Sequence, residues 1–268
     1  MNSGRFNGKR VVVFASGFGV KGPEDIGRAS AIALAAEGAE VAVVQFTQAA
    51  ADECVAQITA AGGKAQAYEA DPRDPHSLEQ LTTNLGSSWG TLDVLVTHHF
   101  GTYVASVADT TLEQWEETIR VNLTSVFMAT KLFLPMLKKS PKASIVHVGS
   151  IDGTLANPNI PAYSASKAGV HILIHSLAGE LGHLGIRVNG ISRAASTILP
   201  LPDNIYRQVN GATPLARAAD PSEYAAAVLF LASEEASYIT GAILPVDGGR
   251  TAVTPGCSPG YKGYLPGA

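Results

Sequence analysis

The sequence has few cysteines, few charged residues and no long apolar run, and each shortage narrows the classes of protein that it can encode. Its two cysteines among 268 residues, Cys54 and Cys257, match no disulfide framework and no metal-ligand spacing. Charged residues make up 16% of the chain and the formal net charge is −4, so no basic surface for nucleic acid or membrane is expected. No apolar run reaches about 18 residues, and the start of the chain lacks the apolar core of a signal peptide. We therefore expect a soluble cytoplasmic protein without a metal site.

Short β-branched segments alternate with alanine-rich segments along most of the chain, and hydrophobic residues make up 46% of it. Strands that are apolar throughout are typical of a parallel sheet covered by helices on both faces. The pattern predicts an α/β fold, a single-domain Rossmann-like doubly wound parallel sheet of about seven strands. The expected strands are 10–14, 40–46, 64–70, 92–97, 144–149, 186–192 and 242–246, with helices near 49–61, 75–88 and 161–184 and from about 112. The domain is expected to cover 1–252, with a substrate lid at about 195–215 and a Gly/Pro/Tyr-rich tail at 253–268.

Three residues form a candidate proton-transfer site. Tyr163 and Lys167 lie four residues apart in one expected helix, so they share a face. A free phenol has a pKa of about 10 and is a poor base near neutrality, whereas a neighbouring ammonium favours the phenolate. Ser150 follows the fifth expected strand, at the edge where open α/β sheets bind ligands. The Tyr-x-x-x-Lys spacing alone also occurs by chance on surface helices, so its context decides.

The context of these residues resembles the short-chain dehydrogenase/reductase family. The matching features are Ser150, the thirteen-residue step to Tyr163, the YSASK sequence at 163–167, VNL at 121–123 and the segment 231–249, within a resemblance that covers roughly residues 8–252. The resemblance implies an NAD(P)-dependent oxidoreductase with Tyr163 as the general acid/base and Ser150 as the group that orients the substrate oxygen. It also implies that Lys167 lowers the pKa of Tyr163 and binds the nicotinamide ribose. Asn122 would hold a water in the proton relay; the alternative is a hydrogen-bonded residue at a helix kink.

The glycine-rich loop departs from the family pattern. The usual TGxxxGIG is replaced by FASGFGVKGPEDIGRA at 14–29, a longer loop in which Ile26 and Gly27 match the end of the motif. Ser16 and Gly17 stand near its beginning, and Asp25 replaces the middle glycine, where a carboxylate repels phosphate unless it caps the helix. The loop is similar to that of the divergent enoyl-acyl-carrier-protein reductase branch, which still binds its dinucleotide. The alternative is a loop that has lost the pyrophosphate.

The choice between NAD and NADP depends on the end of the second expected strand. Gln45 stands there in place of the acidic residue that binds the ribose hydroxyls of NAD. No arginine follows to pair a 2′-phosphate, although Arg28 or Lys21 could take that role. We therefore expect NADP or NAD, with a slight preference for NADP. By resemblance, Asp71, followed by Pro72, contacts the adenine; the alternative is an ordinary turn residue.

Two further departures lie at the ends of later strands. The family's NNAG is replaced by THHFG at 97–101, which places His98 and His99 beside the adenosine ribose or in the cleft. Neighbouring residues of an extended chain point in opposite directions, so this pair is not expected to bind one metal and is interpreted as shape-filling or hydrogen-bonding. Arg193 replaces the usual proline after the sixth strand and either recognises an anionic substrate or phosphate or forms a surface salt bridge.

The substrate side is less specific. Leu199 in the lid, together with Asp152 and Leu155, is expected to face the substrate, and a medium-sized, partly apolar molecule would suit them. Two other functions remain open: a cofactor-independent lyase or dehalogenase on the same scaffold, and a non-catalytic dinucleotide-sensing binder. Halohydrin dehalogenases resemble the family but carry arginine at the position of Lys167, which counts against the first. The resemblance also implies a homodimer or homotetramer, paired through the helices near 112–138 and 161–184.

Overall fold

The computed structural model describes residues 4–17, 26–197 and 203–253. Lys21, Asp25, Leu199 and the tail from residue 254 lie outside the described residues. The described strands are β1 (Arg10–Gly17), β2 (Glu40–Gln45), β3 (Lys64–Glu69), β4 (Val94–Phe100), β5 (Ser144–Ser150), β6 (Arg187–Arg193) and β7 (Ile243–Val246). The described helices are α1 (Ile26–Ala36), α2 (Gln48–Ala60), α3 (Pro75–Trp89), α4 (Leu112–Ile119), α5 (Ser125–Leu137), α6 (Pro161–Leu181), α7 (Asp203–Gly211) and α8 (Pro221–Ala232).

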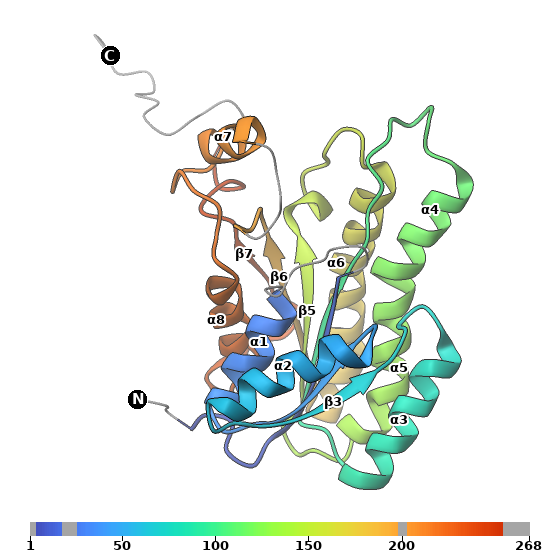
Figure 1. Cartoon of the computed structure of the whole chain (residues 1–268), viewed down its shortest axis with the longest axis vertical. Coiled ribbons are helices and arrows are strands. Elements are labelled where there is room, and N and C mark those ends of the chain that lie inside the picture. Colours follow the sequence, from blue (N-terminus) through green and yellow to red (C-terminus); the bar gives the residue numbers. More distant parts are fainter. Residues whose placement is uncertain (1–3, 18–25, 198–202, 254–268) are drawn as a thin grey trace.

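The strands form one parallel seven-stranded sheet with the order β3-β2-β1-β4-β5-β6-β7. The order reverses direction between β1 and β4, as in doubly wound folds, and the predicted fold class is confirmed. One apolar core lies between the sheet and helices α3, α5 and α6, and a second lies between the sheet and α1, α2 and α8 (Figure 1). Within the described residues, no helix is both long and apolar enough to cross a bilayer.

Two central strands are longer than the sequence indicates. The expected strand 10–14 continues to Gly17, and the expected strand 92–97 is replaced by Val94–Phe100. The two extensions pair with each other, because Ala15, Ser16 and Gly17 are opposite His98, His99 and Phe100 in the β1–β4 register. Ladder pairing therefore overrides the weak strand preference of the segments at 15–17 and 98–100. As a result, the two histidines lie within the sheet.

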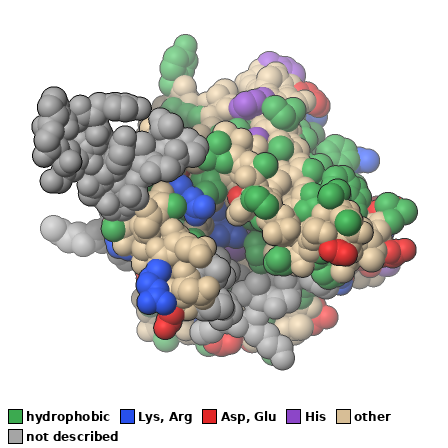
Figure 2. Space-filling model, turned by 90° about the horizontal axis from the view of Figure 1, so that it is seen from above, with side chains coloured by type: hydrophobic (Ala, Val, Ile, Leu, Met, Phe, Trp, Pro, Cys, Tyr) green, Lys and Arg blue, Asp and Glu red, His purple; other side chains and the backbone are tan. Residues whose placement is uncertain are grey.

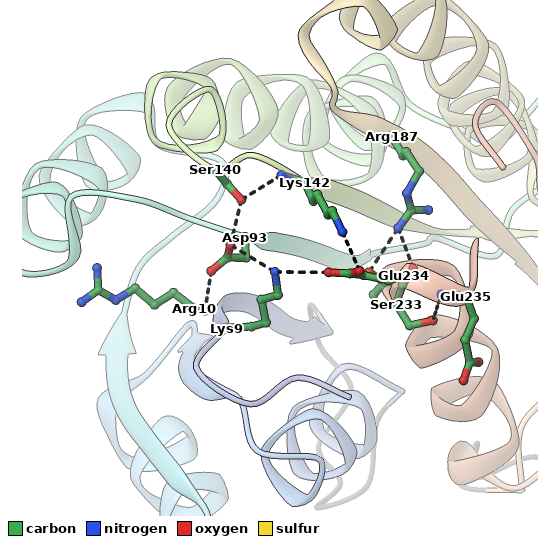
Figure 3. A network of polar contacts seen from close by, with 10 residues as sticks. Lys9, Arg10, Asp93, Ser140, Lys142, Arg187, Ser233, Glu234 and Glu235 are labelled. Carbon is green, nitrogen blue, oxygen red and sulfur yellow. Dashed lines mark hydrogen bonds and ion pairs between the residues drawn. The ribbon is translucent and has the colours of Figure 1, made fainter. Parts of the chain in front are cut away.

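The amino ends of the strands are joined by a polar network at the edge opposite the carboxyl ends (Figure 3). The Asp93 carboxylate accepts hydrogen bonds from the backbone N–H of Arg10 at 2.9 Å and from the Ser140 hydroxyl at 2.7 Å. Lys142 pairs with Glu234 at 2.8 Å, but both side chains are more than half exposed. The buried carboxylate and the exposed ion pair are therefore expected to differ in their contribution to stability.

We expect Asp93→Ala to lower the free energy of unfolding by about 1–3 kcal/mol, because it leaves one buried and one partly buried donor without an acceptor. In contrast, Glu234→Gln in the same network removes only ion pairs of a carboxylate that is itself 57% exposed, and it should change the free energy of unfolding by less than about 1 kcal/mol. Urea unfolding of both variants checks the difference. Equal losses in the two variants would show that Asp93 is no more important than a surface charge.

Candidate active site

The carboxyl ends of β5 and β6 bring together two of the predicted site residues. Ser150 is the last residue of β5, Arg193 is the last residue of β6, and the two are opposite each other in the β5–β6 register. Viewed from the carboxyl end of the sheet, the molecule is hollowed, and basic side chains are visible inside the hollow (Figure 2). This edge is where open α/β sheets place their ligands.

Helix α6 supplies the tyrosine and the lysine of the site. The helix begins at Pro161, whose missing N–H costs nothing at the first helical position. Tyr163 and Lys167 are both buried, with 4% and 2% of their surfaces exposed. The Lys167 ammonium lies 5.7 Å from the centroid of the Tyr163 ring. The structure therefore brings together Ser150, Tyr163 and Lys167 as the sequence predicts.

The pKa of Tyr163 is governed by burial and by Arg193. Burial raises the pKa of the phenol above its usual value. The charge of Arg193 is the largest opposing influence, followed by a hydrogen bond with Ser150. The Lys167 ammonium, which the resemblance expects to lower this pKa, lies 5.7 Å from the centroid of the Tyr163 ring and does not hydrogen-bond to the phenol oxygen. It donates instead to two backbone carbonyls, those of His99 at 2.8 Å and Val148 at 3.3 Å.

Lys167 is itself strongly perturbed. Burial lowers the pKa of its ammonium to about 7, and the neighbouring charge of Arg193 acts in the same direction. A buried ammonium whose pKa is near neutrality can release and take up a proton under working conditions. This property suits a group in a proton relay, and buried residues with perturbed pKa values cluster at functional sites.

Asn122 lies in a π-helical turn, Arg120–Thr124, between α4 and α5. Its side-chain oxygen accepts from the Gly101 N–H at 2.9 Å. Its side-chain nitrogen donates to the Gly101 carbonyl at 2.7 Å and to the Ser166 hydroxyl at 3.1 Å. Both amide hydrogens are therefore used within the protein, as the helix-kink interpretation requires. A water in the relay would have to use the remaining lone pair of the side-chain oxygen or backbone groups.

Phe100 is a site residue that the sequence analysis missed. Its ring packs edge-on against Tyr163, with centroids 5.6 Å apart. The Arg193 guanidinium lies 5.2 Å from the centroid of the same ring. Phe100 therefore links the acid/base candidate to the arginine. The available sequence signal was its position at the end of THHFG, next to the carboxyl edge.

At the cofactor end, Gly27 permits close packing of α1 on β1. A Cβ atom at this position would lie 2.5 Å from the Ala15 Cα, so only glycine fits. Close packing of the helix start against the first strand is the role that the third glycine of a dinucleotide motif performs. Ile26, the first residue of α1, is buried beside it, while Ser16 and Gly17 end β1. The described residues therefore fit a dinucleotide whose pyrophosphate faces this helix start.

The residues expected near the adenosine lie at the ends of neighbouring strands, and two of them are held by protein partners. Gln45 ends β2, as expected. The Asp71 carboxylate is paired with Arg73 at 2.7 Å, and hydrogen bonds from Arg73 help to lower its pKa. Pro72 follows it and is buried. Arg28 is also buried and donates to Glu53 at 3.0 Å, so it is directed toward α2.

The two adjacent histidines are buried, with 5% and 1% of their surfaces exposed, so they do not line an open cleft as one interpretation held. His99 contacts Phe14 and is hydrogen-bonded to Ser125 of α5, which confirms the hydrogen-bonding alternative. His147 of β5 is hydrogen-bonded to Thr97. Among the residues that the structure describes, no group of three metal-ligating side chains converges. These histidines are therefore part of the core beneath the site.

Burial of neutral histidines predicts acid sensitivity. Burial lowers the pKa of His99 and His147 to about 3 and that of His171 to about 4, and it lowers that of His98 in the same direction. An unfolded chain binds protons on these groups below pH ~6.5, whereas the folded chain does not. The free energy of unfolding therefore decreases as the pH is lowered through that range. We expect each histidine to contribute a slope of about 1.4 kcal/mol per pH unit between pH ~6 and ~5.

Urea unfolding at several pH values measures this slope. In the His147→Gln variant the slope should be smaller by about 1.4 kcal/mol per pH unit, which corresponds to one proton. His76→Gln, at an exposed position of α3, is the matched control and should leave the slope unchanged. If the His147→Gln slope equals that of the unmodified chain, the histidine is not responsible for the acid sensitivity.

The predicted substrate residues occupy different positions. Asp152 follows Ser150 in a single helical turn, Ile151–Gly153, and accepts from the Ser150 hydroxyl at 3.2 Å. Burial raises the pKa of its carboxyl, and Arg193 and Arg250 oppose the effect. Leu155 is 44% exposed and borders the same segment. Beside the lid, a cavity of about 440 Å³ is lined by residues that include Ala194, Leu215 and Tyr224.

The sequence of this chain is similar to those of known proteins over most of its length. The family model described as enoyl-(acyl carrier protein) reductase matches residues 19–251. Cyclopentanol dehydrogenase of Comamonas sp. (strain NCIMB 9872) is 35% identical over 256 residues, which cover 93% of this chain and 99% of that protein. The 3-oxoacyl-(acyl-carrier-protein) reductase FabG of Thermotoga maritima is 33% identical, over 84% of this chain and 92% of its own length.

A solved structure of a dehydrogenase/reductase is also similar to this chain in fold and sequence. The crystal structure of a dehydrogenase/reductase from Sinorhizobium meliloti 1021 superimposes with a TM-score of 0.84 at 31% sequence identity. The match covers 93% of this chain and 97% of that chain. The similarity therefore extends over the whole sheet and its helices as well as the catalytic segment.

Proposed function

Since this chain belongs to the short-chain dehydrogenase/reductase family and is an oxidoreductase, we propose that it interconverts a secondary alcohol and a ketone by hydride transfer. Tyr163 is the proposed general acid/base. The observation that carries the proposal is the buried group of Ser150, Tyr163 and Lys167 at the carboxyl edge of the sheet, with the Lys167 ammonium 5.7 Å from the centroid of the Tyr163 ring. A positioned phenol of this kind can give a proton to a ketone, and its phenolate can take one from an alcohol.

Each residue has a distinct role in this proposal. In alcohol oxidation, the Tyr163 phenolate takes the hydroxyl proton; in ketone reduction, the phenol gives a proton to the developing alkoxide. The Ser150 hydroxyl, which donates to Asp152 in this structure, turns to donate to the reacting oxygen and holds it beside the phenol. Lys167 accepts the proton onward, for which its pKa of about 7 is suited. Asn122 positions the relay by fixing the turn that faces α6.

The proposed cofactor is a nicotinamide dinucleotide, with NADP favoured over NAD. When bound, the nicotinamide supplies the hydride acceptor or donor. The start of α1, with Ile26 and Gly27, would hold the pyrophosphate together with Ser16 and Gly17, and Lys167 would bind the ribose at the reacting end. Gln45, Asp71 and Pro72 would border the adenosine. NADP is favoured because no carboxylate stands at the end of β2 to repel a 2′-phosphate.

The test is a dehydrogenase and reductase panel run with both dinucleotides. Purified protein is assayed with secondary alcohols and ketones, and absorbance at the nicotinamide band reports hydride transfer. Direct titration with NADPH and NADH, followed by nicotinamide fluorescence, separates the remaining functions. Binding without turnover would favour a dinucleotide sensor, and failure to bind either dinucleotide would favour a cofactor-independent lyase or dehalogenase.

A homodimer or homotetramer is also proposed. Large apolar side chains are exposed on the face formed by α4, α5 and α6. They include Leu112 at 66%, Trp115 at 39%, Phe127 at 44% and Ile172 at 66% exposed. Burial of such a patch between copies of the chain would remove apolar surface from water. Light scattering of the purified protein measures the assembly.

A further inference from the structure

Arg193 is a buried cation without an anionic partner in the part of the chain that the structure describes. Only 8% of its surface is exposed. One N–H donates to the carbonyl of the adjacent Ala194 at 3.2 Å, and the guanidinium lies over the Phe100 ring. Among the described residues, no carboxylate lies within ion-pair distance of it. A buried charge without a counter-ion is costly, and the guanidinium has five N–H donors to satisfy.

The position of Arg193 places it beside the reacting group. It is opposite Ser150 in the β5–β6 register, so the two side chains leave the sheet on the same face. It shares the Phe100 ring with Tyr163, and the charge of Arg193 acts on the phenol. An anion bound by Arg193 would therefore lie close to the oxygen that Ser150 and Tyr163 hold.

The charges around the site favour a negatively charged ligand. Arg193 is a buried cation at this edge, and Lys167 is a second one while it is protonated, whereas the nearby carboxylates of Asp152 and Asp247 are hydrogen-bonded to other groups. The Asp152 carboxylate accepts from the Ser150 hydroxyl, whose oxygen accepts from the Asp152 backbone N–H, and the carboxylate is not in ion-pair contact with Arg193. The fork of N–H groups on arginine matches a planar carboxylate in two parallel hydrogen bonds.

We propose that Arg193 binds a carboxylate of the substrate, so that the substrate is a short hydroxy acid or the corresponding oxo acid. This inference rests on the proposed oxidoreductase function and names its substrate class. The carboxylate occupies the donors that face the hollow, while the neighbouring hydroxyl or carbonyl oxygen lies between Ser150 and Tyr163. The other source of an anion is a phosphate of the dinucleotide, and the two are separated by the test below.

The test measures binding without turnover. Calorimetric titration of the full chain uses 2-hydroxybutyrate and 3-hydroxybutyrate, each compared with its uncharged methyl ester, with and without saturating NADPH. The acid that fits the site should bind at least about 10-fold more tightly than its ester, as charge-assisted hydrogen bonds allow. Arg193→Gln should reduce that ratio to within about 3-fold, and Arg193→Lys should retain part of it because a point charge remains.

Arg217→Gln is the matched control, because it removes an arginine that is 53% exposed and already paired with Glu223. It should keep the acid preference unchanged. The proposal is overturned if neither acid binds, if the ester binds as tightly as the acid, or if Arg193→Gln keeps the preference. It is also overturned if Arg193→Gln weakens NADPH binding while the acid-to-ester ratio stays the same, since the anion would then be a nucleotide phosphate.

The measurement is independent of the proposed reaction. Acid-selective binding that depends on Arg193, together with no hydride transfer for any alcohol or acid, would refute the oxidoreductase proposal and leave the anion site in place. Hydride transfer with uncharged alcohols, together with no acid preference, would do the reverse. If Arg193→Gln does not fold, the comparison of acid with ester in the unmodified chain and in Arg193→Lys still decides.

Discussion

Replacing Tyr163 by phenylalanine is expected to lower kcat by about 10²–10⁴-fold, the range that a positioned general acid or base contributes. The change removes only the phenol oxygen, so no other group would exchange the proton with the substrate oxygen. The ring remains to pack against Phe100 and to fill the buried position on α6. Stability should therefore change by less than about 1 kcal/mol, so that a loss of turnover cannot be attributed to unfolding.

Steady-state assays with both dinucleotides measure this loss, and dinucleotide fluorescence shows whether binding is retained. Tyr238→Phe is the matched control, because Tyr238 is fully exposed and far along the chain from the site. It should keep full activity. Retention of full turnover by the Tyr163→Phe variant would show that another group transfers the proton.

Replacing Lys167 by methionine is expected to lower turnover by at least about 10²-fold while making the fold more stable near neutral pH. The ammonium is buried and its pKa is lowered to about 7, so the folded state disfavours its charge. Methionine has a similar length and no charge, and replacement of a buried ion by an apolar group often stabilises a protein by about 1–4 kcal/mol. Function and stability should therefore move in opposite directions.

The pH dependence identifies the cause of the stabilisation. Between pH ~7 and ~10 the unfolded chain keeps the Lys167 proton and the folded chain has lost it, so the stability of the unmodified protein rises with pH across that window. The variant lacks this contribution, and its advantage should shrink as the pH rises. Lys131→Met, at an exposed position of α5, is the control. An advantage that is constant from pH ~7 to ~10 would contradict a buried charge as the cause.

The sequence was sufficient for the order of the elements and for the grouping of Ser150, Tyr163 and Lys167 at one edge of the sheet. Apolar runs define the strands, and the spacing from Ser150 through Tyr163 to Lys167 places three side chains from one strand and one helix at the same edge. The ends of β1 and β4 could not be predicted, because each extension exists only through its pairing with the other strand. Local preference therefore ended the expected strand at residue 97, before the two histidines.

The electrostatic role of a charged side chain depends on the direction in which it points, and residue spacing in the sequence does not reveal that direction. The four-residue interval places Lys167 on the same helix face as Tyr163, but it does not show that the ammonium is bound by the carbonyls of His99 and Val148. Likewise, Arg193 was open to interpretation as a surface residue until burial placed it beside the phenol. Phe100 contacts both Tyr163 and Arg193 only because β4 extends to the carboxyl edge.

The hydrogen bonds of Asn122 also have a mechanical consequence. One amide side chain joins the segment after β4, the junction of α4 with α5, and α6, because it bonds Gly101 on both backbone groups and Ser166 on its hydroxyl. A displacement of the α4–α5 junction would therefore move the Gly101 segment after β4 together with α6, the helix that bears Tyr163. If copies of the chain associate through these helices, assembly and the position of Tyr163, the proposed acid/base, are coupled through a single buried amide.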